Sequence, residues 1–373
     1  MPDILCPYCL SKLSRASAYY ECEECGTKME VKSNTVSPRC TNGNCSHRKR
    51  IVLKCKNCDA ELPPRFLDYQ GYVPFAMVGL PGSGKTNYII SSLYRLQSGR
   101  MKNVSVQYMD NDTKELYKAG YKSIYSDHKP VDSTNPGEII PYLYRVQIEK
   151  KGLFGKSHIE SMSMTIFDGA GEDIVKMAED TELNNYIINS KYILFLIDPT
   201  TLDEVETRVV DLEGLEFSRG NRDSRDNNDT RNLITDMASF IKERTNMKLN
   251  SKIKIPVGIV FTKMDLLFDT ADFNCSTVRE KSEHFTKGGF DSSDAELVSQ
   301  EIETYLQNIG ADDFLDVLRM NFENYRFFGV SSFGNTPADK ASKKNSLNQI
   351  DTHRVEDPIM WIFSEEGIIN KIK

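Results

Sequence analysis

Cysteine is almost absent from most of this chain. Of the nine cysteines in 373 residues, eight lie before residue 60 and only Cys275 lies beyond it. A secreted disulfide scaffold would spread its cysteines through the fold, so this distribution excludes that class of protein. Closely spaced cysteine pairs in a reducing compartment indicate metal ligands instead.

Long apolar runs and net positive charge are also missing. The longest apolar run, Tyr192–Ile197, is much shorter than the roughly 20 residues that span a bilayer. The first ten residues already contain Cys6 and Cys9 and do not resemble a signal peptide. The formal net charge of −7 argues against binding of nucleic acid or anionic lipid by the chain as a whole. We therefore expect a cytoplasmic protein that does not bind membranes.

The eight N-terminal cysteines form four pairs, and four thiolates suit tetrahedral zinc. Taken in chain order, the pairs predict two tandem zinc ribbons of residues 1–35 and 36–70, each too short to form a core without a metal. Redox chemistry is the alternative, but no thioredoxin-like βαβ pattern accompanies the pairs. The predicted zinc ligands are Cys6, Cys9, Cys22 and Cys25 in the first ribbon and Cys40, Cys45, Cys55 and Cys58 in the second.

The ribbons themselves are close to neutral. The run Arg48–Arg50 is basic, but residues 1–70 hold 11 Lys and Arg against 8 Asp and Glu, and eight thiolates with two zinc ions cancel the excess. A near-neutral module is a weak phosphate binder. We therefore expect the ribbons to dock a protein partner, with nucleic acid as the less supported alternative.

A phosphate-binding loop follows the ribbons. Val73–Val78 is a strand-like run, Gly79–Thr86 reads G-L-P-G-S-G-K-T, and Asn87–Leu96 has a helical pattern. Strand, glycine-rich loop and helix in this order are typical of a P-loop. Lys85 is expected to reach the β- and γ-phosphates and Thr86 to bind Mg²⁺. The predicted phosphate contacts are Gly79, Gly82, Ser83, Gly84, Lys85 and Thr86.

Three later segments indicate which nucleotide the P-loop domain binds. Asp168–Gly171 reads D-x-x-G at the end of a strand-like run, where Asp168 can hold Mg²⁺ through water and the Gly171 amide can sense the γ-phosphate. A T-K-x-D sequence follows the run Ile255–Phe261, and its carboxylate, Asp265, can accept from the ring N–H and the amine of guanine. Adenine offers no such donor pair.

The predicted base-binding residues are completed by the rest of that motif and by a serine pair. Thr262 opens the T-K-x-D sequence, and Lys263 is expected to lie along the base. Ser331 and Ser332 follow another apolar run, at the position where a loop would contact the guanine carbonyl oxygen. Apolar strands alternating with helices predict an α/β fold, a mostly parallel sheet with helices on both faces, for residues 71–373.

In order and context, these four motifs resemble the Ras-like, translation-factor-related class of P-loop GTPases over roughly residues 72–373. Cysteine ribbons before a P-loop, the D-G-A-G-E run and Val355–Trp361 also resemble the double-GTPase families of bacterial conflict systems. The resemblance implies a regulatory switch acting beside other components of defence gene clusters.

The class resemblance also implies a threonine that closes over the γ-phosphate and Mg²⁺. Thr134, a few residues before the strand-like run Tyr142–Ile148, is the candidate, and Thr113 in a helical stretch is its rival. Ras-type enzymes carry a water-orienting glutamine where this chain has Glu172, which cannot donate to the γ-phosphate. Residues 219–231 form a polar insertion with four arginines, which we interpret as a solvated loop rather than a source of an arginine finger.

These patterns together predict a GTP-binding and GTP-hydrolysing switch, slow without a partner. Its expected cofactors are GTP or GDP, Mg²⁺ and two Zn²⁺ ions. A nucleotide-sensing scaffold without useful hydrolysis, which Glu172 favours, and a P-loop ATPase, which Asp265 disfavours, remain the alternatives.

Overall fold

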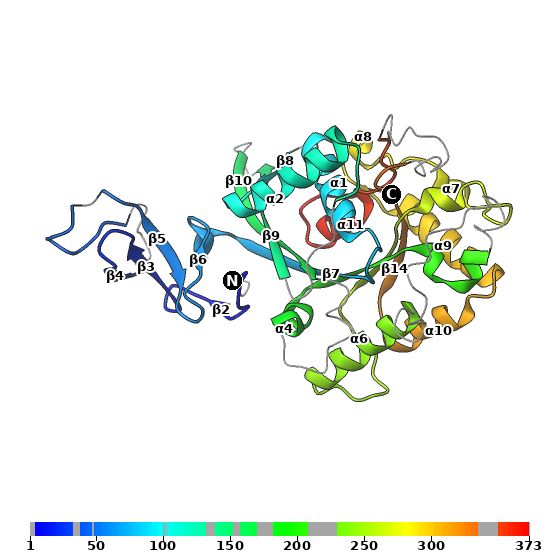
Figure 1. Cartoon of the computed structure of the whole chain (residues 1–373), viewed down its shortest axis with the longest axis horizontal. Coiled ribbons are helices and arrows are strands. Elements are labelled where there is room, and N and C mark those ends of the chain that lie inside the picture. The colour runs from blue at the N-terminus through cyan, green and yellow to red at the C-terminus, as the bar shows by residue number, and fades with distance from the viewer. Residues whose placement is uncertain are drawn as a thin grey trace.

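The computed structural model describes residues 4–32, 38–46, 48–99, 101, 103–131, 139–151, 157–169, 182–207, 230–334 and 350–372. An N-terminal module extends from one side of a larger domain that is built on a seven-stranded sheet (Figure 1). Within these residues no helix has the length and apolar character needed to cross a membrane.

The sheet is parallel over five adjacent strands, and its last two strand pairings are antiparallel. The predicted mostly parallel α/β fold is therefore confirmed. Every residue of the central strand β7 is buried, as a strand covered on both faces requires. Across the sheet the strands lie in the order β14 (Tyr325–Gly329), β12 (Val257–Phe261), β11 (Tyr192–Ile197), β7 (Gly71–Val78), β10 (Ser157–Gly169), β9 (Ile139–Lys151) and β8 (Val104–Tyr108).

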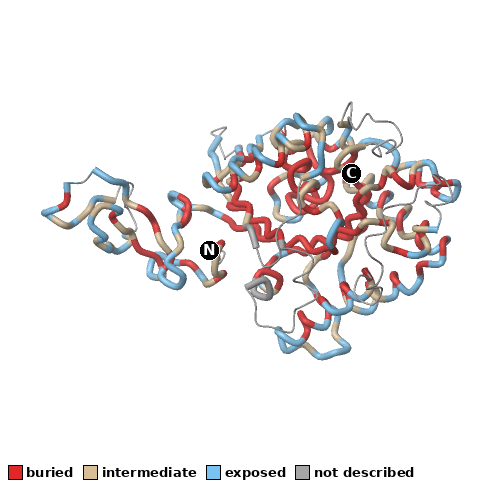
Figure 2. Tube along the Cα trace, in the orientation of Figure 1, coloured by how far each residue is buried: buried red, intermediate tan, exposed pale blue. Residues whose placement is uncertain are grey.

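Helices cover both faces of this sheet, and two apolar clusters fill the space beneath them (Figures 1 and 2). On one face lie α1 (Lys85–Ser98), α2 (Asn111–Tyr121), a π-helical turn (Lys122–Ser126) and α11 (Asp357–Glu365). On the other lie α4 (Glu182–Asn189), α6 (Thr230–Arg244), α9 (Ser292–Asn308) and α10 (Asp312–Asn321). The short elements α7 (Ser276–Arg279), α8 (His284–Lys287), β13 (Phe290–Asp291) and β15 (Lys371–Ile372) complete the domain.

The C-terminal helix α11 belongs to the core. Trp361 is 6% exposed and its ring contacts those of Tyr192 in β11 and Phe328 in β14. All residues from Asp357 to Ser364 are buried. The apolar part of the motif Val355–Trp361 therefore serves to pack the sheet.

The N-terminal module is a small antiparallel structure made of three cysteine-bearing hairpins. The first hairpin pairs β1 (Ile4–Leu5) with β2 (Lys12–Leu13). The other two form one four-stranded sheet in the order β4-β3-β5-β6. Its strands are β3 (Ala18–Cys22), β4 (Lys28–Glu30), β5 (Ile51–Cys55) and β6 (Glu61–Leu62).

The pairing of β3 with β5 connects the two predicted ribbons into one unit. Ala18 lies opposite Cys55, and Cys22 lies opposite Ile51. The two strands run antiparallel, so their cysteines lie at opposite ends of a ladder about 14 Å long. This register decides which cysteines can meet.

Candidate functional site: nucleotide and metal centres

Two groups of four cysteines form in the module, but they are not the predicted sets. One group is Cys6, Cys9, Cys55 and Cys58, and the other is Cys22, Cys25, Cys40 and Cys45. The prediction of one metal within residues 1–35 and another within 36–70 is therefore wrong. Each group takes one pair from either segment, because the β3–β5 register brings the start of the module to the end of β5.

The sulfur geometry of both groups fits zinc. Cys6 and Cys58 sulfurs lie 3.8 Å apart, and those of Cys9 and Cys55 also 3.8 Å. In the other group the closest distances are 3.7 Å for Cys22 to Cys45 and 3.5 Å for Cys25 to Cys40. A tetrahedron with Zn–S bonds of about 2.3 Å has edges of about 3.8 Å. Four thiolates would hold each zinc ion, which would tie the hairpins together.

Four sequence motifs of the larger domain meet at one edge of its sheet. The P-loop follows β7, Asp168 lies near the end of β10, the T-K-x-D sequence follows β12, and the serine pair follows β14. These four strands are parallel, so their carboxyl ends share one edge. In open α/β sheets this edge is where ligands bind.

The P-loop has the backbone that a phosphate cradle needs. A Cβ atom at Gly79 would collide with the carbonyl oxygen of Leu196, and Gly84 begins α1 in the left-handed region with φ 83°. Glycine is the residue that meets both conditions. Helix α1 starts directly after it, so its N-terminal amides face the same loop.

Lys85 and Asp168 lie together beneath the loop. The Lys85 ammonium, on a side chain 9% exposed, donates to the Gly79 carbonyl at 2.9 Å, and Thr86 donates to Asp168 Oδ2 at 3.2 Å. Burial lowers the pKa of Lys85, and the charge of Asp168 opposes this shift. Burial also raises the pKa of Asp168, opposed by Lys85 and Thr86. Its other oxygen, Oδ1, has no hydrogen-bond partner among the described residues, which leaves it for a Mg²⁺-bound water.

The T-K-x-D sequence is tied to the P-loop. Thr262 donates to the carbonyl of Ser83 at 2.7 Å, and Lys263 donates to that of Gly82 at 3.0 Å. Lys263 also forms an ion pair with Asp198 at 2.5 Å. Thr262 thus positions the loop with its hydroxyl, and its expected contact with the nucleotide stays a prediction. Sequence reasoning missed Asp198, although it follows the apolar strand β11 at the same sheet edge.

Asp265 carries an unsatisfied carboxylate oxygen. Its Oδ1 is enclosed and lacks a hydrogen-bond partner in the part of the chain that the structure describes. Burial raises the pKa of this carboxyl, against a hydrogen bond from Ser331 and the nearby charge of Lys263. The next serine, Ser332, accepts a hydrogen bond from the Ser91 hydroxyl of α1 at 3.1 Å. The unpaired Oδ1 after β12 is a buried acceptor without a donor among the described residues, and a guanine edge would supply one.

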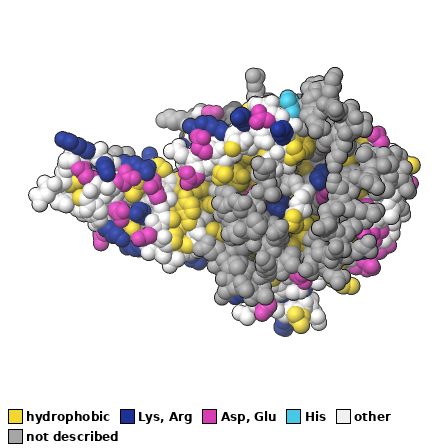
Figure 3. All heavy atoms as spheres, in the orientation of Figure 1, with side chains coloured by type: hydrophobic (Ala, Val, Ile, Leu, Met, Phe, Trp, Pro, Cys, Tyr) yellow, Lys and Arg dark blue, Asp and Glu magenta, His cyan; other side chains and the backbone are white. Residues whose placement is uncertain are grey.

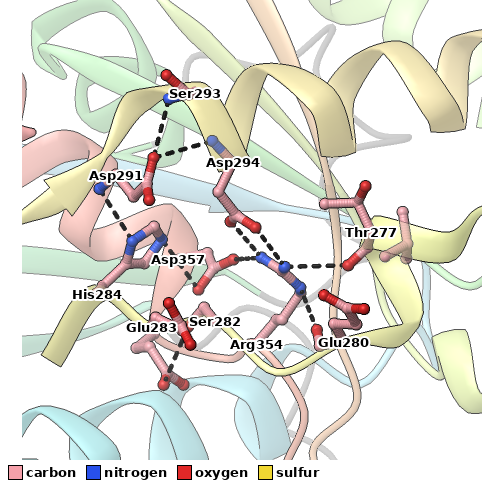
Figure 4. Close-up of polar contacts among 12 residues, drawn as sticks. Thr277, Glu280, Ser282, Glu283, His284, Asp291, Ser293, Asp294, Arg354 and Asp357 are labelled. Atoms are coloured by element: carbon pink, nitrogen blue, oxygen red, sulfur yellow. Dashed lines mark hydrogen bonds and ion pairs between the residues drawn. The ribbon is translucent and has the colours of Figure 1, made fainter. Parts of the chain in front are cut away.

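The serine loop is held from behind by the chain before α11. Ser331 and His353 exchange backbone hydrogen bonds of 2.9 and 2.8 Å. The next residue, Arg354, is 2% exposed and bonds to the carboxylates of Asp294 and Asp357 at 2.8 Å (Figure 4). His284 with these two carboxylates is close enough to hold a metal ion, but the Arg354 guanidinium already bonds to both carboxylates and neutralises one of their two charges. We interpret this cluster as an ion-pair network that fixes the loop.

Of the two candidate switch threonines, Thr113 lies within the described residues and Thr134 does not. Thr113 is fully buried in α2, where its hydroxyl accepts from the Leu143 amide at 2.9 Å. This commitment to packing contradicts Thr113 as a nucleotide ligand. Thr134 lies outside the described residues, but the amide of Val131, three residues earlier, donates to Asn87 at 2.8 Å. The role of Thr134 stays a prediction.

Gly171 and Glu172 lie outside the described residues, as do Arg219, Arg222 and Arg225 of the insertion. The last insertion arginine is described: Arg231 at the start of α6 lies 3.5 Å from Glu204 and 3.9 Å from Asp203. The roles of Gly171, Glu172 and the insertion arginines stay predictions.

The family comparison matches most of the larger domain. The profile of the Double-GTPase 2 family matches residues 74–334, from β7 to the loop after β14. No curated protein matches the sequence.

Several solved structures resemble the chain at low identity. They include the signal recognition particle receptor SRb-GTP/SRX complex from Chaetomium thermophilum, with 14% identity, a TM-score of 0.30, and coverage of 72% of this chain and 94% of that one. The Arl6 small GTPase from Trypanosoma brucei shows 12% identity, a TM-score of 0.33, and coverage of 80% and 99%. The Ski7 GTPase-like domain from S. cerevisiae shows 14% identity, a TM-score of 0.33, and coverage of 82% and 52%.

Proposed function

Because the chain belongs to the Double-GTPase 2 family, we propose that it binds GTP with Mg²⁺ at the sheet edge, hydrolyses it slowly and acts as a molecular switch. The preference for guanine rests on the Oδ1 of Asp265, which is enclosed and has no hydrogen-bond partner among the described residues. Leaving such an oxygen unbonded costs about 1–3 kcal/mol or more for a charged group. A guanine base would satisfy it with two N–H donors, and adenine would not.

The chain's own residues support each part of binding. The P-loop amides and the start of α1 would bind the phosphate oxygens, and Lys85 would neutralise their charge. Thr86 and the Oδ1 of Asp168 would orient Mg²⁺, which when bound supplies charge stabilisation at the β- and γ-phosphates. Lys263, fixed by Asp198, would flank the base.

Slow hydrolysis follows from the sequence at the water-orienting position. Glu172 lacks the amide donor of a glutamine and brings a negative charge toward the phosphates. A partner, or an arginine of the insertion, would then supply the missing positive charge. Slow turnover suits a switch, since the GTP state must last long enough to be recognised.

We further propose that the metal module docks a protein. Basic and acidic side chains alternate over its surface (Figure 3), and several are already paired, as Arg50 is with Glu23 and Glu61. A nucleic-acid surface would gather unpaired positive charge on one face. The resemblance of the sequence to families of bacterial conflict systems supports a cytoplasmic defence or signalling role.

Nucleotide titration and single-turnover hydrolysis on the purified chain test this function. We expect GTP to bind at least tenfold more tightly than ATP and to be hydrolysed at or below about 10⁻³ s⁻¹. Equal affinity for ATP would overturn the guanine assignment. Binding of GTP with no hydrolysis above the uncatalysed rate, in the presence of candidate partners, would favour the scaffold alternative.

A further inference from the structure

The three C-x-x-C hairpins of the module share one turn. In each, the amide of the residue after the second cysteine donates back to the first cysteine: Leu10 to Cys6 at 3.0 Å, Gly26 to Cys22 at 2.8 Å and Asp59 to Cys55 at 2.9 Å. In each, that residue lies in the left-handed region, with φ of 57°, 68° and 59°. Glycine adopts this conformation freely and aspartate tolerates it.

Leucine is the unfavourable choice at this position. A γ-branched apolar side chain with positive φ is sterically disfavoured and has no polar group to compensate locally. The Leu10 side chain is nevertheless 7% exposed, in a small cluster separate from the apolar cluster that the rest of the module shares with Tyr72 and Leu143 of the domain. The side chain therefore serves a contact outside the hairpin.

That contact is with the nucleotide domain. Leu10 clusters with Phe167 of β10 and Tyr186 of α4, and the two rings stack with centroids 4.1 Å apart. The Tyr186 hydroxyl donates to the backbone carbonyl of Tyr8 at 3.0 Å, inside the same hairpin. The turn between Cys6 and Cys9 thus holds both rings from one side.

Phe167 directly precedes Asp168. It is 1% exposed, so its ring cannot shift without moving the adjoining backbone. Asp168 in turn receives the hydroxyl of Thr86 and lies beside Lys85. A chain of packed groups therefore runs from the metal hairpin to the carboxylate expected to orient Mg²⁺.

We propose that the Cys6–Cys9 hairpin is a positioning element for the nucleotide site, acting through Leu10, Phe167 and Tyr186 on Asp168. Docking of the hairpin raises the affinity of the domain for Mg²⁺-bound nucleotide. A protein that pulls on or displaces the module lowers it. This inference rests on the proposed GTP site and extends it to a route by which the metal module and the nucleotide influence one another.

The hairpins themselves provide a matched pair of variants in the full chain. Leu10→Gly removes the side chain and relieves the turn, so the zinc content stays at two per chain while the contact is lost. Asp59→Gly makes the same backbone change in the hairpin of Cys55 and Cys58, which would ligate the same metal. It removes the acceptor of the Tyr19 hydroxyl within the module but contacts neither β10 nor α4. Tyr186→Phe removes only the hydrogen bond to Tyr8 and keeps the ring stack.

The readout is the dissociation rate of a fluorescent GTP analogue from each variant, with Mg²⁺ and with EDTA. We expect Leu10→Gly to accelerate dissociation roughly 3- to 30-fold in Mg²⁺, Tyr186→Phe to accelerate it less, and Asp59→Gly to leave it unchanged. In EDTA the difference should vanish, because Asp168 acts through the metal. Equal rates for Leu10→Gly and wild type in Mg²⁺, or an equal acceleration in EDTA, would overturn the proposal.

A second measurement separates failure of this inference from failure of the GTP assignment. Hydrogen exchange in the nucleotide-free chain should speed up at residues 164–168 and 186–189 in Leu10→Gly but not in Asp59→Gly. A chain that binds no guanine nucleotide but shows this difference retains the mechanical link and loses the proposed function. Unchanged exchange in both variants removes the link.

Discussion

The metal module and the nucleotide domain hold their functional groups in opposite ways. In the module the cysteines build the fold, since its strands of two to five residues surround two four-cysteine groups. Its small apolar cluster is shared with Tyr72, Met109 and Leu143 of the domain. In the domain the fold holds the functional groups, since two large buried clusters fix the strands whose ends carry the site. Losing ligands should therefore unfold the first region, and losing site residues should leave the second folded.

Removal of zinc is the largest expected effect. Structural zinc contributes roughly 10–16 kcal/mol to small cysteine folds, so stripping both ions should unfold residues 1–70 while the domain stays protected from proteolysis. The purified chain should contain two zinc ions by elemental analysis. A module that resists proteolysis after complete removal of zinc would show that its fold does not depend on the metal.

A single cysteine variant sharpens this test because Cys22 belongs to the group that does not include Cys6 and Cys9, whose hairpin contacts the domain. Cys22→Ser should lower the zinc content to one ion per chain and leave GTP affinity unchanged. Loss of both ions would mean that the two groups form cooperatively rather than independently.

Lys85→Ala should do the reverse and abolish GTP binding without unfolding. The ammonium is the charge that the phosphates meet in the buried loop, so we expect an affinity loss of about 100-fold or more. Zinc content and the thermal midpoint of the nucleotide-free chain serve as controls. A fall in either would show that Lys85 supports the fold as well as the site.

Asp265→Asn should weaken the site and spare or strengthen the fold. We expect GTP affinity to fall by roughly 10- to 100-fold, with a shift of preference toward xanthine nucleotide, whose ring carbonyl suits an amide donor. Burial raises the pKa of Asp265 in the empty protein. Stability from this group is therefore present at low pH and lost as pH rises through the raised pKa.

The variant removes that pH-dependent cost. Its thermal midpoint without nucleotide should match the wild type below about pH 4 and equal or exceed it near neutrality. A lower midpoint at neutral pH would mean that both carboxylate oxygens of Asp265 already have hydrogen-bond partners without nucleotide. The argument for guanine from an unpaired Oδ1 would then be wrong.

Much of the domain could be predicted from sequence because its signals are local. Runs of apolar residues marked β7, β10, β11, β12 and β14, and the motif at each strand end marked the site. The edge strand β8, which is half exposed, carries a weaker pattern and was missed. The cysteine groups could not be predicted from spacing, because the register of β3 against β5 is a tertiary choice that sequence order does not contain.

Thr113 gives the smallest effect and completes the comparison, since it is a polar group of the domain that serves the fold alone. Thr113→Val deletes the acceptor of the buried Leu143 amide, so the free energy of unfolding should fall by about 1 kcal/mol. Thr113→Ser keeps the hydroxyl and should fold like the wild type. Both should bind GTP within about twofold of the wild type, because the hydroxyl faces β9 and not the P-loop.

Thr134→Val is the matched contrast: it should weaken binding of GTP with Mg²⁺ more than that of GDP, with little change in stability. Denaturant unfolding and nucleotide titration on the four proteins decide between the threonines. If either Thr113 variant lost affinity for GTP but kept its affinity for GDP, Thr113 rather than Thr134 would contact the γ-phosphate.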